Sequence, residues 1–510
     1  MIHDLRQFPR VSTLHCDVAI VGAGAGGMTA ARVIAQAGLR VVVLEAGSYV
    51  TPDDVTQREE SMLPLLYCDA AGRTTRDRLI RIHQGKGVGG STLHNLNLCK
   101  RIPDQILARW HTEQPLHHLP LQTWDALFAE AEQLLGVTAV APAQWNRHNQ
   151  LLAAACDKLG WRWAGLHHNR AGCVGSGFCE LGCAFDTKNN AAKVMLPEAI
   201  AAGAVVIHHA HTVAIGHDHG RARDVSVRSV DDRGDLGQQW LTVAADRVVV
   251  AASATGTPAL LRRSAVPDAS GQAGNTLRIH PAVVAAGEFD QPVHAWDGIP
   301  QTVECTEFLD FGDQPRAAPS RIWIVPAFGH PMGTATMMPG YGPRHRQFML
   351  GYPKMAVFCA MLHDQSAGSV RPAGETGVAI DYEPNGADCR ELLAGLHKLT
   401  LALFAAGARK VWLPAAEPIA LEHPVPFSEL AQLDPRQLGL TAVHPMGTCP
   451  MSDNPAHGPV DSRGKHHGMQ NLWVADGSLY PTSIGGPPQL GIYALGLHIG
   501  RAVIADARQR

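Results

Sequence analysis

The feature that most constrains the fold lies near the N-terminus, where an apolar segment runs directly into a glycine-rich turn. Residues 16–21 are rich in β-branched side chains, which is typical of a buried parallel strand. Gly22, Gly24 and Gly27 follow with the spacing of a dinucleotide-binding turn. In such a turn the glycines permit a tight bend, a close approach to a pyrophosphate and close packing of the next helix. The order of strand, turn and helix predicts a Rossmann-like unit.

The residues beyond the glycines complete this unit. Residues 28–37 supply a helix, and Gly38 supplies its C-terminal stop. A second apolar strand, residues 40–44, ends at Glu45, about twenty residues past the glycines, where a ribose-binding carboxylate belongs. Residues 85–90 fit the same glycine pattern, but no βαβ unit surrounds them. We therefore interpret only the first run as a nucleotide site.

Size and composition fit a large globular protein. The chain has 510 residues, which is enough for two or more domains and a large core. Apolar residues make up 45% and charged residues 17%, a balance without a signature of disorder. The formal charge of −3 favours neither nucleic acid nor an anionic lipid surface. We expect a small-molecule substrate and no nucleic-acid partner.

The ends of the chain and its cysteines bear on location. The first ten residues show no apolar signal core and no twin arginine, and no run approaches the length of a membrane span. Eleven cysteines in a chain of this length do not form a dense disulfide framework. We expect a cytoplasmic protein with no direct membrane span, unless a partner subunit carries it elsewhere.

The order of strand-like and irregular segments predicts two domains. Strands typical of a nucleotide-binding sheet recur at 204–207 and 247–252. Residues 321–325 and 354–358 are typical of antiparallel strands, and residues 391–406 have helical periodicity. We predict an α/β fold in which a discontinuous Rossmann-like domain is interrupted by insertions that form an α+β domain with an antiparallel sheet. The predicted ranges are 14–100, 170–279 and 435–510 for the first domain, and 101–169 and 280–434 for the second.

A second informative stretch lies near the C-terminus. His444 opens the sequence His-Pro-Met-Gly-Thr-Cys, Asp476 and Gly477 follow a short apolar strand, and a Gly/Pro-rich segment at 485–489 precedes the last helix. Imidazole is the side chain best suited to moving protons near neutral pH. A glycine turn after a strand lets the backbone approach a bound ligand. This stretch therefore holds candidate catalytic and cofactor-binding groups.

These motifs together resemble the glucose–methanol–choline (GMC) family of flavin oxidoreductases. Residues 87–95 resemble the first family signature, a loop along the flavin, and residues 252–261 resemble the second. Residues 274–281 are similar to the segment that leads into the substrate domain, and residues 474–478 to the segment that contacts the ribityl chain and pyrophosphate. The resemblance covers nearly the whole chain and is nearest the long-chain alcohol, sterol and sugar dehydrogenase branches.

The resemblance implies FAD rather than NAD as the cofactor. A single well-formed dinucleotide fingerprint agrees, because no separate nicotinamide-binding module is present. The residues implied to bind the cofactor are Gly22, Gly24, Gly26, Gly27, Glu45, Ala46, Gly89, Gly90, Ser91, Asn95, Val213, Ala252, Asp476, Gly477, Pro488 and Gln489.

The resemblance also implies that His444 takes the hydroxyl proton of an alcohol while flavin N5 accepts the hydride. The family usually places a second His or Asn on the loop before the last helix, but Pro487 stands there in this chain. Proline has no side-chain group for hydrogen bonding. Either another residue orients the alcohol, such as Asn95, Asn97 or Gln489, or His444 works with less help.

A second departure is the Gly-rich loop 172–183, which contains Cys173, Cys179 and Cys183. Similar loops occur in the same branches, and in multisubunit sugar dehydrogenases the loop resembles a ligand set for a three-iron cluster. Iron–sulfur clusters often use four cysteines, and this loop offers three. We favour a structural thiol cluster, a disulfide or a zinc site over an iron–sulfur cluster.

The expected function is FAD-dependent oxidation of an alcohol to an aldehyde or ketone, with oxygen, a quinone or a partner cytochrome as the electron acceptor. Residues 188–193 are similar to branches that act on bulky, apolar alcohols. Apolar side chains in the second domain give mild support: Trp296, Trp323, Phe328, Met332, Met337, Met338, Phe358 and Met361. Two alternatives stay open, namely a flavin-dependent lyase of the same fold and the catalytic subunit of a dehydrogenase that passes electrons through an iron–sulfur cluster.

Overall fold

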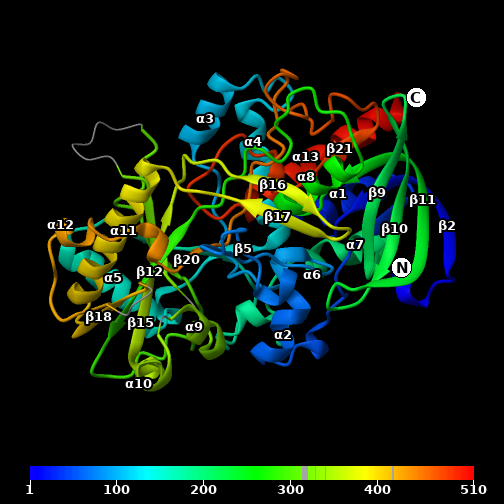
Figure 1. The fold of residues 1–510 in the computed structure, drawn as a ribbon. Coiled ribbons are helices and arrows are strands. Elements are labelled where there is room, and N and C mark those ends of the chain that lie inside the picture. Colours follow the sequence, from blue (N-terminus) through cyan, green and yellow to red (C-terminus); the bar gives the residue numbers. More distant parts are fainter. Residues whose placement is uncertain (313–319, 328, 339, 416–418, 510) are drawn as a thin grey trace.

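Two β-sheets organise the chain, and each has its own apolar core (Figure 1). The computed structural model describes residues 1–312, 320–327, 329–338, 340–415 and 419–509. Phe328, one of the apolar residues noted in the sequence, lies outside the described residues. In Figure 1 the first sheet lies at the end of the molecule that holds both termini, and the second sheet lies at the other end. The predicted α/β class is confirmed.

The first sheet contains eight strands among the described residues, in the order β1-β8-β3-β2-β11-β10-β9, with β21 beside β11. Their bounds are β1 Ile2–Asp4, β2 Val11–Val21, β3 Val41–Leu44, β8 Val205–His208, β9 Ala210–Asp218, β10 Arg221–Val230, β11 Leu236–Val250 and β21 Leu472–Val474. Strands β1, β8, β3, β2 and β11 pair in parallel in that order, and β21 pairs in parallel with β11. Strands β10 and β9 add an antiparallel edge beside β11. Every residue of β3 is buried, as expected for a parallel strand covered on both faces.

Helices cover this sheet, and two of them, one from each end of the chain, pack side by side. Helix α1 (Ala25–Gln36) begins inside the glycine turn, and α13 (Gln489–Arg508) packs beside it. Among the described residues, α13 alone is long and apolar enough to cross a membrane. Its buried side chains, which include Leu490, Tyr493 and Leu497, belong to the core of the first sheet. Helix α13 is therefore accounted for as a core helix.

The second sheet contains nine strands in the described part of the chain and includes the predicted antiparallel pair. Its strands are β4 Ile80–Ile82, β6 Trp163–Gly165, β12 Ala282–Glu288, β13 Val303–Cys305, β14 Ile322–Pro326, β15 Met355–Leu362, β18 Lys410–Leu413, β19 Ile419–Leu421 and β20 Leu440–Ala442. Helices α5 (Arg147–Leu159) and α11 (Gly386–Ala405) pack against it. Helix α11 starts earlier than predicted, because the Asn385 side chain accepts hydrogen bonds from the N–H groups of Ala387 and Asp388.

The remaining helices and two hairpins surround the sheets. Their bounds are α2 Glu59–Leu66, α3 Asp104–Glu113, α4 Leu121–Leu135, α6 Ala191–Val194, α7 Leu196–Ala201, α8 Ser253–Arg263, α9 Pro331–Met337, α10 Gly342–Gly351 and α12 Phe427–Leu430. Two small antiparallel sheets accompany them, one of β5 Val137–Ala139 and β7 His167–Asn169, the other the hairpin of β16 Ser369–Ala373 and β17 Gly377–Asp381. The predicted domain boundaries stay a prediction. Two segments pack across them: Trp110 and Trp124 of α3 and α4 join the core of the first sheet, and β4 and β20 join the second sheet.

Candidate active site

One cavity of about 800 Å³ is lined by residues of both sheets and of the segments between them. Most of the residues predicted to bind the cofactor or substrate line it: Gly22, Gly24, Gly26, Glu45, Ala46, Gly90, Ser91, Asn95, Ala252, His444, Asp476, Gly477, Pro488 and Gln489. Gly27, Gly89 and Val213 are not among its lining residues, although Thr212, next to Val213, is. The structure thus brings together sequence motifs from both ends and the middle of the chain.

The glycine turn has one face against protein and one face open to the cavity. A Cβ added at Gly26 would lie 1.9 Å from the carbonyl oxygen of Ala475, so a side chain there would displace backbone. A Cβ at Gly24 would meet nothing within 4 Å, although Gly24 lines the cavity. Gly26 therefore permits packing between distant chain segments, whereas Gly24 leaves room for a ligand.

The Glu45 carboxylate joins three turns at the edge of the cavity. It accepts backbone N–H hydrogen bonds from Ala23 at 2.9 Å, Gly47 at 2.8 Å and Gly87 at 3.0 Å. Burial raises the pKa of Glu45, and these three donors oppose that shift by favouring the ionised form. The second glycine run therefore belongs to the same wall as the fingerprint, even though it is not a βαβ unit.

Asp476 orders another part of the cavity wall. Its carboxylate accepts hydrogen bonds from the N–H groups of Ser253 at 2.9 Å and Ser478 at 2.8 Å, and from the Thr257 hydroxyl. Burial raises the pKa of Asp476, while these hydrogen bonds lower it. The carboxylate thereby fastens the C-terminal turn to the first residues of α8, where a negative charge also favours the helix N-terminus.

His444 faces a second histidine that the sequence did not mark as functional. The Nδ1 atoms of His444 and His280 lie 3.2 Å apart, and the Gly485 N–H donates to His280 Nε2 at 3.0 Å. Burial lowers the pKa of His444 well below its usual range, with a smaller contribution from His280, and burial lowers the pKa of His280 to about 3. Both imidazoles are therefore neutral at pH 7.

The residues near Pro487 differ in what they offer the cavity. Asn95 Nδ2 donates to Gln489 Oε1 at 2.7 Å, and Gln489 Nε2 donates to the Leu98 carbonyl at 2.6 Å. Both polar atoms of the Gln489 side chain are therefore hydrogen-bonded to protein. Buried Asn95 Oδ1, in contrast, has no hydrogen-bond partner among the described residues. Asn97 is buried but is not a lining residue. Asn95 is the one of these three that presents an unused polar atom to the cavity.

Lys188 is a further residue whose importance the sequence did not reveal. Its side chain is 1% exposed, and its ammonium donates to the carbonyls of Leu93, Asn95 and Cys179. Burial lowers the pKa of Lys188 to about 8. The three donors of this ammonium match the three carbonyls, so Lys188 holds the loop 89–95 in place against the cysteine loop.

The three cysteines of the loop 172–183 are free thiols in the structure, so the disulfide considered from the sequence does not form here. Cys173 Sγ accepts from the guanidinium of Arg170 and the N–H of Gly175, and Cys183 Sγ accepts from the N–H of Thr187. Among the described residues, two groups of side chains are close enough to hold a metal ion, and these cysteines belong to neither. The loop is therefore described by its hydrogen bonds to protein.

The part of the cavity near the second sheet is apolar. Several residues of the predicted apolar set line it, namely Trp323, Met332, Met337, Met338 and Met361, whereas Trp296 and Phe358 do not. Phe348, Met355 and Trp412 add to this lining. Glu180 is its unexpected member: burial raises the pKa of this carboxyl to about 8, so it is mostly protonated at pH 7. An apolar wall with few polar groups suits a ligand with a large hydrocarbon part.

The fold and the cavity indicate a dinucleotide-dependent oxidoreductase, because a Rossmann-like turn, a neutral imidazole and an apolar chamber line the same cavity. Comparison with family models is more specific. The GMC oxidoreductase N-terminal model matches residues 20–282, and the C-terminal model matches residues 364–496. The chain belongs to the GMC oxidoreductase family and is an FAD-dependent oxidoreductase.

Similar proteins cover nearly the whole chain. A GMC-type oxidoreductase of Mycobacterium tuberculosis is 35% identical over 500 residues, which are 97% of this chain and 76% of that protein. A long-chain-alcohol oxidase of Arabidopsis thaliana is 26% identical over 521 residues, covering 98% of this chain and 68% of that protein. Pyridoxine 4-oxidase from "Mesorbium loti" has a TM-score of 0.70 at 18% identity, covering 96% of this chain and 99% of the other, and supports the fold alone.

The residues present fit FAD. The open space at Gly24 suits a pyrophosphate that approaches the start of α1. Two buried polar atoms on the loop 89–95, His94 Nε2 and Asn95 Oδ1, have no partner among the described residues, and both residues line the cavity. Buried polar atoms are usually hydrogen-bonded, so these two are available to a polar ring system beside the loop.

Two alanine substitutions should distinguish the ligand-binding face of the glycine turn from the face that packs against protein. Gly24→Ala should leave the urea unfolding of the apoprotein nearly unchanged but weaken FAD binding about tenfold or more, because the methyl group occupies the ligand's space. Gly26→Ala should destabilise the apoprotein by about 1–3 kcal/mol, because its Cβ overlaps the Ala475 carbonyl. Equal loss of apoprotein stability in both variants would contradict this division.

Proposed function

We propose that this protein oxidises a bulky, apolar alcohol to an aldehyde or ketone with FAD as the cofactor. The observation that carries the proposal is the partly buried, neutral His444 on the wall of a cavity that also has an apolar part. The resemblance to long-chain-alcohol oxidases at modest identity supports the same substrate class.

We assign the cofactor's parts to the residues that line the cavity. The turn from Gly22 to Gly26 binds the pyrophosphate, and Glu45 accepts a hydrogen bond from the ribose. The loop 89–95, which the Lys188 ammonium fastens, would hold the flavin ring. FAD, when bound, supplies the hydride acceptor at N5.

His444 takes the hydroxyl proton of the alcohol. Because the Gly485 N–H occupies His280 Nε2, neutral His280 carries its proton on Nδ1 and donates it to His444 Nδ1. In this arrangement the proton of His444 lies on Nε2. To accept a proton at Nε2, His444 must instead carry its own proton on Nδ1 and donate it to His280. His280 is then protonated on Nε2 and loses the Gly485 hydrogen bond, at a cost of at least about 1–3 kcal/mol, because a buried donor is left unsatisfied.

His280 therefore supplies the neighbouring imidazole that Pro487 cannot. It reaches the site from the segment 274–281 rather than from the loop before α13. When His444 becomes positively charged, His280 Nδ1 can accept its proton in a hydrogen bond and so stabilise the imidazolium. The two-residue arrangement usual for the family is thus restored from a different part of the chain.

Anaerobic titration with primary and secondary alcohols of increasing chain length tests the proposal. The yellow absorbance of bound FAD should bleach, and the apparent affinity should rise with chain length, because each buried methylene contributes about 0.8 kcal/mol. A lyase of the same fold would convert its substrate while the flavin stays oxidised, and that result would refute the proposal. Readmitting air, or adding a quinone or dye, then assigns the electron acceptor.

Replacing His444 should remove proton acceptance without removing the fold. His444→Ala should purify as yellow, folded protein, with alcohol-dependent flavin reduction lowered about a hundred- to ten-thousandfold. His280→Ala should lower it about tenfold, and His280→Asn should restore part of that loss, because Asn offers a polar partner and tolerates the left-handed conformation found there (φ 50°). Reduction at the wild-type rate in His444→Ala would remove this residue from the mechanism.

The pH dependence should reflect the lowered pKa of His444. A lowered pKa keeps the proton-accepting form populated as the pH falls through the ordinary histidine range, so activity is lost only at more acidic pH. The rate of flavin reduction at saturating alcohol should therefore be nearly constant from about pH 6 to about pH 7.5 in stopped-flow measurements. Glu180→Gln serves as the control, because Glu180 ionises at about pH 8. A half-maximal rate near pH 6.5 would show that His444 titrates as an exposed histidine does.

A further inference from the structure

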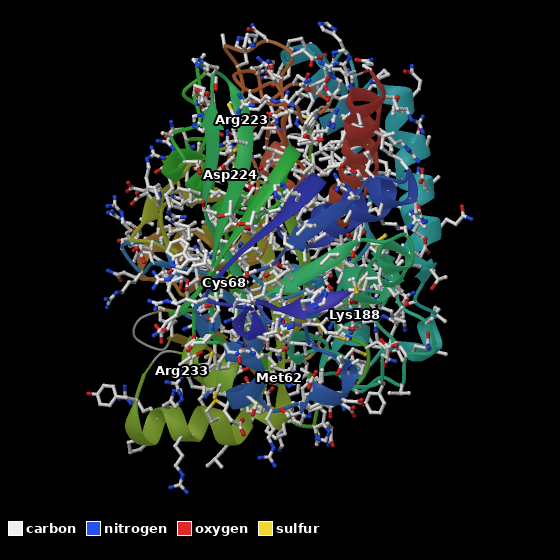
Figure 2. The ribbon with its side chains drawn as sticks, turned by 90° about the vertical axis from the view of Figure 1, so that its right-hand side faces the viewer. Met62, Cys68, Lys188, Arg223, Asp224 and Arg233 are labelled. Carbon is white, nitrogen blue, oxygen red and sulfur yellow. The ribbon has the colours of Figure 1, made fainter. Side chains whose placement is uncertain are left out.

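Helices α9 and α10 form an outer wall of the apolar chamber. Met337 and Met338, at the end of α9, line the cavity, as does Phe348 of α10. Phe348 packs with Ala286 and Met355 of the second sheet. Figure 2 shows α10 projecting from the bottom of the molecule, with one long side clear of the other ribbons. This segment separates the chamber from the surroundings.

The outward side chains of this wall are unusually apolar. Tyr341 is 92% exposed and Leu350 is 71% exposed, at opposite ends of α10. Met332 of α9 is 42% exposed and also lines the cavity, so the chamber reaches the surface beside this side chain. Large exposed apolar side chains on elements that also line a pocket are typical of an interaction surface.

The charges of this wall have one sign. The sequence from 320 to 363 contains no Asp or Glu, although the whole chain has 46 acidic residues. Arg344 and Arg346 on α10 and Lys354 just after it are exposed, and none of them has a carboxylate within salt-bridge distance among the described residues. Glu59 of α2 is the neighbouring acid, and it accepts the N–H groups of Met332 and Gly333 at the start of α9.

We propose that the surface formed by Met332, Tyr341, Arg344, Arg346, Leu350 and Lys354 docks on an anionic lipid bilayer, from which the apolar alcohol enters the chamber beside α9. Basic side chains flanking exposed Tyr and Leu match the headgroup region, where cations meet anionic lipid and apolar tips enter the acyl boundary. The bilayer is favoured over an acidic protein because a hydrocarbon-rich alcohol is itself dissolved in lipid. The part of this inference that concerns the alcohol rests on the proposed function.

Vesicle co-sedimentation of the full-length, FAD-loaded protein tests the surface without turnover. The protein should bind phosphatidylcholine vesicles containing about 30% phosphatidylglycerol, and high salt should weaken that binding. Arg344→Gln with Arg346→Gln should reduce binding about tenfold or more, and Tyr341→Ser with Leu350→Ser should reduce it at least about tenfold. These side chains point away from the chamber, so reduction of the flavin by a water-soluble alcohol should stay at the wild-type rate.

Matched controls come from other faces of the molecule. Arg223→Gln removes an exposed arginine that Figure 2 shows near the end of the molecule opposite α10. Val11→Ser removes an apolar side chain that is 74% exposed on β2. Both variants should bind vesicles as the wild type does.

The outcomes separate the two proposals. Absence of binding to anionic vesicles, or equal losses in the test and control variants, overturns the docking surface. If vesicles bind but no alcohol bleaches the flavin, the surface stands and the proposed function fails. If soluble alcohols bleach the flavin while vesicles do not bind, the function stands and the docking surface fails.

Discussion

The close contact between the N-terminal glycine turn and the C-terminal strand end is the constraint on which the cavity depends. Gly26 lies against the Ala475 carbonyl, and the next residue, Asp476, fastens the start of α8. Three segments that are hundreds of residues apart therefore meet at one point. Because β2, β11 and β21 are neighbours in one parallel sheet, their carboxyl ends open on the same side, and the chain places its ligand-binding turns there.

The chemistry of the site follows from burial rather than from charge. His444 and His280 share one hydrogen bond in a desolvated place, so neither imidazole is charged at pH 7. A neutral pair can receive one proton and stabilise the resulting imidazolium by a hydrogen bond between the two rings, which an isolated buried imidazole cannot do. Lys188 is the opposite case, a buried cation whose hydrogen bonds to three carbonyls connect the loop 89–95 to the cysteine loop.

The sequence predicted the parts of the structure that depend on local pattern. Continuous apolar runs marked β3 and the second half of β2, and the glycine spacing marked the turn before α1. The family resemblance named His444 and Asp476, and both line the cavity. The sequence could not reveal His280 or Lys188 as site residues, because their roles arise from contacts across 164 and 93 residues of chain. The start of α11 was missed for a local reason, since the Asn385 cap adds residues that lack apolar periodicity.

The surface around α10 shows why a chain-wide average is a poor guide to partners. A net charge of −3 predicts no attraction to anionic lipid, yet the segment 320–363 contains no Asp or Glu. Within it, Arg344, Arg346 and Lys354 have no carboxylate partner among the described residues, and Tyr341 and Leu350 are exposed. Screening limits the reach of an exposed charge to about 8–10 Å at physiological salt, so a surface responds to its nearest charges and not to the sum over the molecule. A local basic and apolar patch can therefore coexist with an acidic protein, and its position at the mouth of the chamber connects the surface to the chemistry inside.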